Sequence, residues 1–443
     1  MEIAISEHFT YKKLIKFTLP TIIMMIFTSI YGVVDGIFIS NVVGNSAFAS
    51  VNLIMPVIMI LGAFGFMCGT GGSAMVSKTL GEGENEKANK YFSMIIYFEI
   101  ILGIIFTIIG LLAIEPITRL LGATNEMMEY SLNYGRILLC EITFFLLQNS
   151  FQSFIVVANK PQFGLIITFI AGITNMILDA LFVYVFKFGV KGAAFATIIS
   201  QFIGAIIPLI YFIRKNNSLL KLVKTKFELK PILKTCSNGS SEMVTNASLS
   251  IINMLYNYQL MKYIGQDGVT AYGIIMYVGF IFAGVYMGYS VGTAPIIGYN
   301  YGSKNNEELK GLLKKSLKLL CMSSVILTLL AEIFAKGLAS IFVGYDSNLL
   351  KLTTNAIRLY SISYIISWMN IFASSFFTAL NDGLTSAIIS FLRTLVFQII
   401  MILLLPWIFG INGIWLSVVV AELLSLVVSI FYLITKRKIY NYA

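Results

Sequence analysis

The sequence predicts an all-α membrane protein with twelve transmembrane helices, in two six-helix bundles related by pseudo-twofold symmetry along the membrane normal. Three observations predict it: composition, the spacing of charged residues and an internal repeat. The 443 residues are 58% hydrophobic and 12% charged, against roughly 25% charged in an average soluble domain. The charged residues cluster between apolar runs of at least about 20 residues, which is long enough to cross a bilayer.

The apolar runs place the predicted membrane spans in order along the chain. They cover residues 14–40, 48–78, 91–113, 129–158, 163–187, 191–213, 235–261, 268–300, 312–334, 350–380, 384–409 and 413–435. Several exceed the length a bilayer requires, so we expect tilt, kinks or extension past the headgroups. The first run is too long for a signal peptide and lacks a small-residue cleavage site, so it should stay in the mature protein.

The positions of lysine and arginine predict the orientation, because basic loops are retained in the cytoplasm. Most basic residues fall before the first span or after an even-numbered one. Only Arg119, Lys187, Lys191, Lys262, Lys336 and Lys351 fall in loops on the other side. Both termini are therefore predicted to be cytoplasmic. The most basic connection predicts a linker at 214–234 between an N-terminal six-helix lobe, 1–213, and a C-terminal six-helix lobe, 235–443.

Composition also argues against several function classes. The net charge of +10 comes from residues between apolar runs, so it indicates a membrane orientation and no nucleic-acid partner. Four cysteines are scattered singly, which is typical of small apolar fillers. The only histidine, His8, lies in the N-terminal tail, so neither a histidine proton relay nor a multi-histidine metal site is expected.

An internal repeat appears when the chain is offset by half its length. At an offset of 221, residues 44–86 lie on 265–307 without a gap and match at Gly71/Gly292 and Gly81/Gly302, among others. At 222, Asn159 lies on Asn381. Each unit has an even number of spans, so the halves are predicted to be parallel repeats with a site at their interface. Gly284, Gly288 and Gly292 are spaced four apart, which favours close helix packing in lipid.

Ionisable residues inside the spans mark candidate functional positions, because each costs roughly 2.5 to 3.5 kcal/mol by insertion measurements. Asp35 and Asp179 are the clearest cases, and both are predicted in the outer half of the membrane. Tyr31 and Asn175 precede them by four residues and share their helix faces. Thr197 lies about two turns into the sixth span. Two carboxylates in low dielectric would share a proton or bind a cation; the alternative is that these groups only join helices as hydrogen-bonding partners.

Other polar residues are weaker candidates. Four glutamates are candidate interfacial or cavity residues, and Arg393 is a candidate partner for one of them; they are Glu99, Glu141, Glu332 and Glu422. Glu242 lies near the start of its span, where snorkelling lowers its cost. Tyr256 and Asn257 are candidate contacts in a substrate cavity.

Several stretches of this chain together resemble the MATE (multidrug and toxic compound extrusion) family, and within it the DinF-like branch with MepA-like members. They are LP at 19–20, YGVVDG at 31–36, residues 44–83, NMILD at 175–179, GVKG at 189–192 and PIIGYNYG at 295–302. The resemblance covers nearly the whole chain. Its specificity lies in the combination of these stretches.

The resemblance implies a secondary active antiporter that exports amphipathic, often cationic organic compounds by alternating access. It implies a proton or Na⁺ site at Asp35, Asn175, Asp179 and Thr197, with Tyr31 nearby, and a kink in the first span at Pro20. Asn370 stands where another branch carries an acidic residue, and Glu242 does not match that branch's glutamate in the seventh span. Gln152 matches a polar position of the fourth span. With Tyr256 and Asn257, Gln152 and Asn370 complete the candidate cavity.

Two other functions are weighed against transport. A lipid-linked oligosaccharide flippase of the same superfamily would need a large basic cleft, and the spans offer few internal lysines or arginines. A polytopic membrane enzyme would need nucleophiles or metal ligands near the interface, and the sequence offers no such constellation. The glycine-rich run at 69–73 lacks the P-loop pattern, so no ATP is expected. The chain is thus predicted to work as a multi-pass monomer of a cell membrane, the bacterial inner membrane, with small organic substrates, a coupling ion and no other cofactor.

Overall fold

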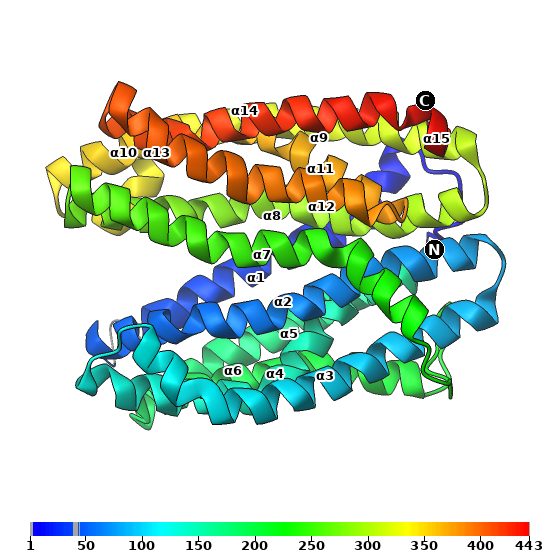
Figure 1. The fold of residues 1–443 in the computed structure, drawn as a ribbon, viewed down its shortest axis with the longest axis horizontal. Helices are drawn as coiled ribbons and strands as arrows, with labels where there is room; N and C mark the ends of the chain where they lie inside the picture. The colour runs from blue at the N-terminus through cyan, green and yellow to red at the C-terminus, as the bar shows by residue number, and fades with distance from the viewer. Residues whose placement is uncertain (1–2, 39–42, 44, 443) are drawn as a thin grey trace.

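The computed structural model describes residues 3–38, 43 and 45–442, and its elements are helical (Figure 1). In chain order they are α1 Tyr11–Phe38, α2 Asn45–Gly81, α3 Asn85–Leu120, α4 Asn125–Val157, α5 Pro161–Asp179, η2 Ala180–Val185, α6 Gly189–Ile213, α7 Leu229–Tyr263, α8 Gln266–Gly302, α9 Asn306–Val343, α10 Ser347–Ser361, α11 Tyr364–Ala379, α12 Gly383–Phe391, η3 Leu392–Val396, α13 Phe397–Phe409, α14 Ile411–Thr435 and α15 Arg437–Tyr440. The short segments η2 and η3 are π-helical.

The helices form two bundles, as the sequence predicts. Helices α1–α6 make the N lobe and α7–α14 make the C lobe (Figure 1). Within the described residues, ten helical stretches are long and apolar enough to cross a membrane, and α10 with α11 forms an eleventh span bent by 47°. The predicted span at 350–380 therefore has a bend in its middle, one of the ways in which a long span was expected to fit the bilayer.

Helix α7 is the twelfth span and differs from the rest in composition. It has 35 residues and is about 52 Å long at 1.5 Å per residue, so its length suffices to cross a bilayer. Its first half is rich in Ser, Thr and Asn, which keeps it below the hydropathy of a lipid-exposed span. Thr235, Asn238 and Ser241 are buried, so the polar face of that half packs against protein. The helix begins at Leu229 rather than at residue 235, where the sequence predicted it.

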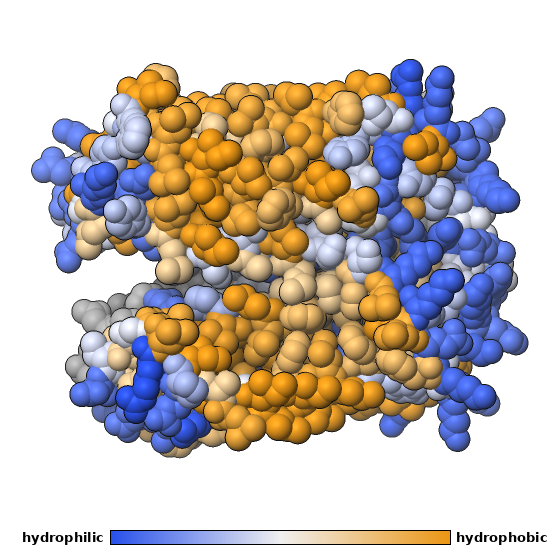
Figure 2. All heavy atoms as spheres, in the orientation of Figure 1, coloured by the Kyte–Doolittle hydropathy of each residue, from blue (hydrophilic) through white to orange (hydrophobic). Residues whose placement is uncertain are grey.

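The two ends of the molecule are unlike. The end we call the basic end carries both termini and the α2–α3, α4–α5, α6–α7 and α8–α9 connections (Figure 1). On the face shown in Figure 2, hydrophilic residues cover this end, and an apolar band crosses the middle of the molecule. At the opposite end, which we call the open end, Figure 2 shows the surface hollowed between the two lobes.

The lobes meet along α1 with α8 and along α2 with α7. The glycine stripe of α8 faces α1, as its spacing predicts. A Cβ atom built on Gly288 would lie 2.5 Å from the Cα of Ile22, and one on Gly292 would lie 2.5 Å from the Thr21 Oγ1. Only glycine permits this separation between the two helices.

Pseudo-twofold symmetry is visible where α2 and α8 cross at the basic end. A Cβ on Gly81 would lie 2.0 Å from the carbonyl oxygen of Tyr299, and a Cβ on Gly302 would lie 2.0 Å from that of Lys78. These are repeat equivalents, since 81 and 302, like 78 and 299, differ by 221. Each helix thus makes the same contact to the other, which is the property of a contact on a twofold axis.

The N-terminal segment, residues 3–10, joins both lobes at the basic end. Ile5 and Phe9 are buried, and the Ile5 N–H donates to the Asn159 side chain of the N lobe at 3.0 Å. The Phe9 N–H donates to Glu308 at the start of α9, at 2.9 Å. His8 contacts the same carboxylate at 2.5 Å. The segment therefore bridges the lobes opposite the hollow.

Candidate functional site

The C-terminal half of α5 buries two polar residues on one face. Asn175 is 2% exposed and Asp179 is fully buried, and four residues separate them, about one helical turn. The α-helix ends at Asp179 and continues as the π-helical segment η2. Single π-helical turns concentrate at functional sites because the wider turn redirects neighbouring side chains. The predicted pair is therefore buried and lies at a local break in helix geometry.

Helix α1 brings Tyr31 against the same part of α5. Gly172 lies one turn before Asn175, and a Cβ there would be 2.5 Å from the Phe27 ring and 2.9 Å from the Tyr31 ring. Glycine at this position allows α1 to approach, which places Tyr31 beside the Asn175 turn. The backbone of Asp35 continues α1, but its side chain lies outside the described residues.

Thr197 is half-buried on α6, which packs against α5 and η2. A Cβ on Gly192 would meet the Phe182 backbone at 3.0 Å, which fixes the start of α6 against η2. The Thr197 hydroxyl donates to the carbonyl of Ala193 in its own helix at 3.1 Å. Its oxygen lone pairs remain available as acceptors. Among the described contacts, no hydrogen bond joins Thr197 to α5.

This environment suits a cation or a proton. The Oδ1 atom of Asn175 is buried without a hydrogen-bond partner, and such an atom gains from a donor or cation. The helical stretches 17–38, 161–186 and 192–213 contain no lysine or arginine. In the described part of the chain, no three His, Cys, Asp or Glu side chains gather as in a transition-metal site. Carboxylate and amide oxygens instead match hard cations and protons.

In the C lobe, an arginine side chain neutralises a buried carboxylate. Glu422 on α14 accepts from the Arg393 Nε at 2.9 and 3.1 Å and lies 2.8 Å from the Arg393 Nη2. Arg393 lies in η3. The sequence expectation that Arg393 pairs with a buried acid is thus confirmed. The Asn370 amide donates to Glu422 at 2.7 Å, and Ser429 donates to the Asn370 oxygen at 2.8 Å.

The sequence did not predict a group of serine and threonine hydroxyls beside the Arg393–Glu422 pair. Ser374 lies 2.9 Å from Ser386 and 2.8 Å from Ser390, and Thr378 lies 2.7 Å from Ser386. These side chains join α11 to α12. The sequence signal was a serine or threonine every three or four residues, which also occurs in ordinary helix packing.

The other acids in the spans have structural partners. Glu99 accepts from the Ser150 hydroxyl. The Gln201 amide nitrogen, oriented toward Glu141, lies 2.7 and 3.0 Å from its carboxylate oxygens. Ser361 donates to Glu332 at 3.0 Å. Side-chain hydrogen bonds therefore hold each of these carboxylates in place.

The four predicted cavity residues lie in separate places. Tyr256 is 2% exposed, stacks on Tyr272 at 4.8 Å between ring centres, and lies 3.4 Å from Gln398. Its neighbour Asn257 is exposed. Gln152 lines a small cavity of about 10 Å³ between α1, α4, α5 and α6, roughly the space of one water molecule. Asn370 belongs to the Arg393–Glu422 network.

Pro20 lies inside α1, which remains helical on both sides of it. Proline has no N–H, so the carbonyl of Lys16 lacks its usual helical hydrogen bond. This makes Pro20 the weak point of α1 for bending.

Comparison with known proteins agrees with the duplicated fold. The MatE family model matches residues 20–181 and again 243–404. The two starting points differ by 223 residues (243 minus 20), close to the offset found within the sequence. One model matching twice shows that the two halves are copies of one unit.

Relatives and solved structures cover the whole chain. The multidrug export protein MepA of Staphylococcus haemolyticus is 25% identical over 436 residues, which is 97% of this chain and 95% of MepA. A MATE transporter solved in complex with MaL6 has a TM-score of 0.93 at 22% identity, over 98% of both chains. A multidrug resistance MATE family transporter of the MOP superfamily, solved in an outward-facing conformation, has a TM-score of 0.92 at 23% identity, again over 98% of both. The chain therefore belongs to the MATE family of membrane transporters.

Proposed function

We propose that this chain exports amphipathic organic cations across the cell membrane by antiport with H⁺ or Na⁺, and that the coupling ion binds in the N lobe. The site consists of Asn175 and Asp179 on α5, Tyr31 and Asp35 on α1, and Thr197 on α6. The substrate class agrees with the name of the MepA relatives, which are multidrug export proteins.

One observation carries the placement of the ion site: the two lobes differ in charge balance. The buried Glu422 of the C lobe already has a cation, Arg393, within 2.8 Å. A second cation there would meet the charge of the guanidinium. The helices around Asp179 carry no lysine or arginine at membrane depth, so a cation entering the N lobe meets oxygen ligands and no competing positive charge.

Ion binding would act on helix packing. A proton or Na⁺ at Asp179 changes the charge buried between α1 and α5, which pack closely at Gly172. Because each charge state favours a different packing of these helices, occupancy shifts the equilibrium between conformations. Pro20 is the point at which α1 bends most easily. Drug and ion thus exclude one another through conformation, which is the requirement for antiport.

The form described here is proposed to be open to the outside. The hollow between the lobes lies opposite the termini (Figure 2), and the basic residues collect at the terminal end. Because basic loops are retained inside, the termini are proposed to be cytoplasmic and the hollow extracellular. Each monomer contains both lobes, so one chain provides a complete pathway.

Reconstituted transport tests the proposal. Purified protein in liposomes would export ethidium, a fluorescent organic cation, under an imposed proton or Na⁺ gradient applied separately. Asp179→Asn is expected to lower the gradient-driven rate at least about tenfold, since removing a required charge costs a transition-state or binding contribution above 1.4 kcal/mol. The more effective gradient identifies the coupling ion.

Glu99→Gln is the matched control, because it also neutralises a fully buried acid of the N lobe, and Glu99 bonds to Ser150 away from the proposed ion site. It should retain export. Thermal unfolding of both variants separates lost coupling from lost structure. Wild-type rates in a folded Asp179→Asn protein would contradict the proposed site.

A further inference from the structure

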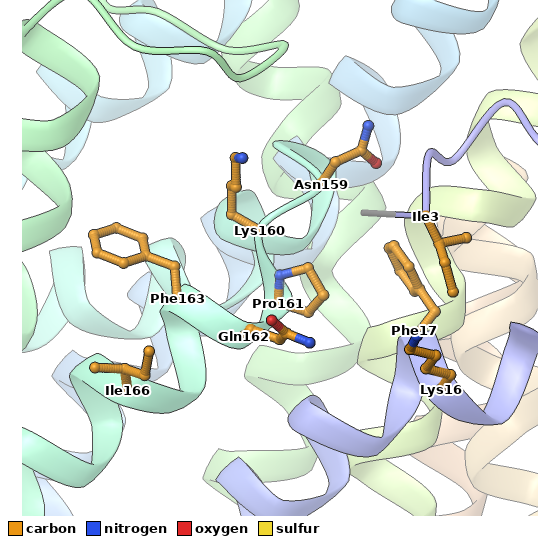
Figure 3. A pocket seen from close by; sticks show the side chains of 9 residues that line it. All are labelled: Ile3, Lys16, Phe17, Asn159, Lys160, Pro161, Gln162, Phe163 and Ile166. Atoms are coloured by element: carbon orange, nitrogen blue, oxygen red, sulfur yellow. The ribbon is translucent and has the colours of Figure 1, made fainter. Parts of the chain in front are cut away.

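Two adjoining pockets form a basic groove on the N lobe at the basic end. The first, of about 370 Å³, lies between the start of α1 and the start of α5 (Figure 3). The second, of about 530 Å³, lies between the start of α5 and the end of α6. Lys160 and Phe163 line both. The Phe163 ring packs on Tyr211 of α6 at 4.8 Å between centroids, so the two pockets share an aromatic wall.

The groove is lined by cations from three parts of the chain. They are Lys16 of α1, Lys160 before α5, and Arg214 and Lys215 after α6. The described lining of either pocket contains no acidic residue. Of the ion pairs among described residues, none involves Lys16, Arg214 or Lys215. Several positive charges that line adjoining pockets without a lining acid favour a bound anion.

Side-chain hydrogen bonds order the loop that holds Arg214 and Lys215. The Asn216 amide donates to the carbonyls of Tyr211 and Arg214, at 3.0 and 3.2 Å. The Ser218 hydroxyl in turn donates to the Asn216 oxygen at 2.7 Å. These bonds close the end of α6 and fix the direction in which the two basic residues leave it.

Apolar surface continues from the groove toward the middle of the membrane. Ile166, Ile170, Ile173 and Ile177 follow one face of α5 and are 44% to 61% exposed. Ile210 of α6 is 43% exposed beside the second pocket. A ligand that fits both parts needs an anionic head and apolar tails, which describes a phospholipid.

We propose that this groove binds the headgroup of an anionic phospholipid, with its acyl chains along the exposed isoleucines of α5 and α6. A free phosphate would match the cations but leave the isoleucine face unused. The lipid contacts the helices that carry Lys16 and Asn175, so the site touches both α1 and α5 at the cytoplasmic leaflet. This inference does not depend on the proposed transport, because its test measures binding.

Lipid binding to the purified full-length protein in neutral detergent tests the proposal. The probes are dioleoylphosphatidylglycerol, dioleoylphosphatidylcholine and inorganic phosphate, with affinity followed by native mass spectrometry and by the shift in Tm. Phosphatidylglycerol should bind and raise the Tm, whereas phosphatidylcholine and phosphate at equal concentration should not. The triple variant Lys16→Gln, Arg214→Gln, Lys215→Gln should bind phosphatidylglycerol about 100-fold more weakly, at roughly 1 kcal/mol for each cation and 1.4 kcal/mol for each tenfold change.

The matched control removes three exposed basic residues from the C lobe at the same end, in the variant Lys310→Gln, Lys314→Gln, Lys438→Gln. It has the same net charge and should bind within about threefold of wild type. Equal losses in both triple variants would reduce the effect to general charge and overturn the site. Undiminished binding in the groove variant, or equal stabilisation by inorganic phosphate, would also overturn it. If the groove variant does not fold, Lys16→Gln alone should still weaken binding about fivefold at the same 1 kcal/mol.

Discussion

Buried charged groups of this protein either pair with an opposite charge, as in the C lobe, or belong to the proposed ion site of the N lobe. Arg393 and Glu422 satisfy one another, and removing one partner leaves a charge in a low-dielectric site. Arg393→Met is therefore expected to lower the free energy of unfolding by about 3 to 5 kcal/mol, and Glu422→Gln by a similar amount. Denaturation in mixed micelles, followed by circular dichroism, measures both.

The double variant Arg393→Met, Glu422→Gln distinguishes a paired charge from general packing. With both charges gone, no uncompensated ion remains, so the protein should recover most of the loss. The coupling energy of the cycle is then expected to exceed about 2 kcal/mol, because the two residues are in direct contact. Additive losses would show that each residue acts through other neighbours.

Asp382, in the connection between α11 and α12, gives a pH dependence. Burial raises the pKa of its carboxyl, but hydrogen bonds from Thr385 and Tyr440 and the charge of Lys436 outweigh burial, so the pKa lies below its usual value. The carboxyl caps α12 through the Thr385 N–H at 3.2 Å and lies 3.4 Å from the Lys436 ammonium. A lowered pKa stabilises the fold above the pKa of the unfolded chain, about 3.9, and this stabilisation is lost as pH falls through the folded value.

Asp382→Asn keeps a good helix cap but removes the charge. The wild type should therefore have the higher Tm from pH 7 down to about 5, with the difference closing below pH 4. Differential scanning fluorimetry across this range measures it, and the effect should stay below about 1 kcal/mol because the pair is partly solvated. Lys436→Gln should give the same profile. A difference that did not shrink as the pH fell below 4 would point to packing rather than charge.

At the scale of elements, α2 and α8 cross in close contact at the basic end. The opposing carbonyl at each glycine belongs to a helix backbone and cannot rotate away. Gly81→Ala and Gly302→Ala should each force the helices apart and cost about 1 to 3 kcal/mol, as overpacking does. Because the two contacts are repeat equivalents, their losses in Tm should be equal.

Gly273→Ala on α8 is the control for these substitutions. Nothing lies within 4 Å of a Cβ at that position, so alanine should be neutral or stabilising by up to about 1 kcal/mol. Clearly unequal effects at Gly81 and Gly302 would contradict a twofold axis through this crossing.

Some of the helical elements could be predicted from the sequence, and others could not. Apolar runs predicted the spans, matching glycines predicted the repeat, and the glycine spacing of α8 predicted a close helix contact, whose partner α1 only the structure identifies. The π-helical segments η2 and η3 left no signal, because one added residue per turn does not change composition. The bend between α10 and α11 was missed because serine and tyrosine there fit a continuous helix equally well.

Of the candidate site, the structure bears on the burial that polarity at membrane depth predicts. Asn175 and Asp179 are buried as expected, since lipid penalises charge anywhere else on α5. The cavity residues were harder to place, because a tyrosine such as Tyr256 serves equally as a core or a cavity residue. The bridge that residues 3–10 form between the lobes could not be predicted. It depends on contacts with Asn159 and Glu308, which lie far away in the sequence.

At the scale of the whole molecule, parallel duplication explains why one end is so basic. Each unit has an even number of spans, so equivalent loops of both copies lie at the same end and their charges add. Retention of basic loops then orients both lobes together. The α6–α7 connection should face the cytoplasm, and the α9–α10 connection should face outside.

Site-specific labelling in intact cells checks this orientation. Tyr345, between α9 and α10, is 82% exposed, and Asn217, after α6, is also exposed. In a background with Cys68, Cys140, Cys236 and Cys321 replaced by alanine, a membrane-impermeant maleimide should label Tyr345→Cys from outside. It should label Asn217→Cys only after the membrane is permeabilised. The reverse pattern would place the hollow on the cytoplasmic side, which would make the described form inward-open and require the coupling ion to enter the N lobe from the cytoplasm.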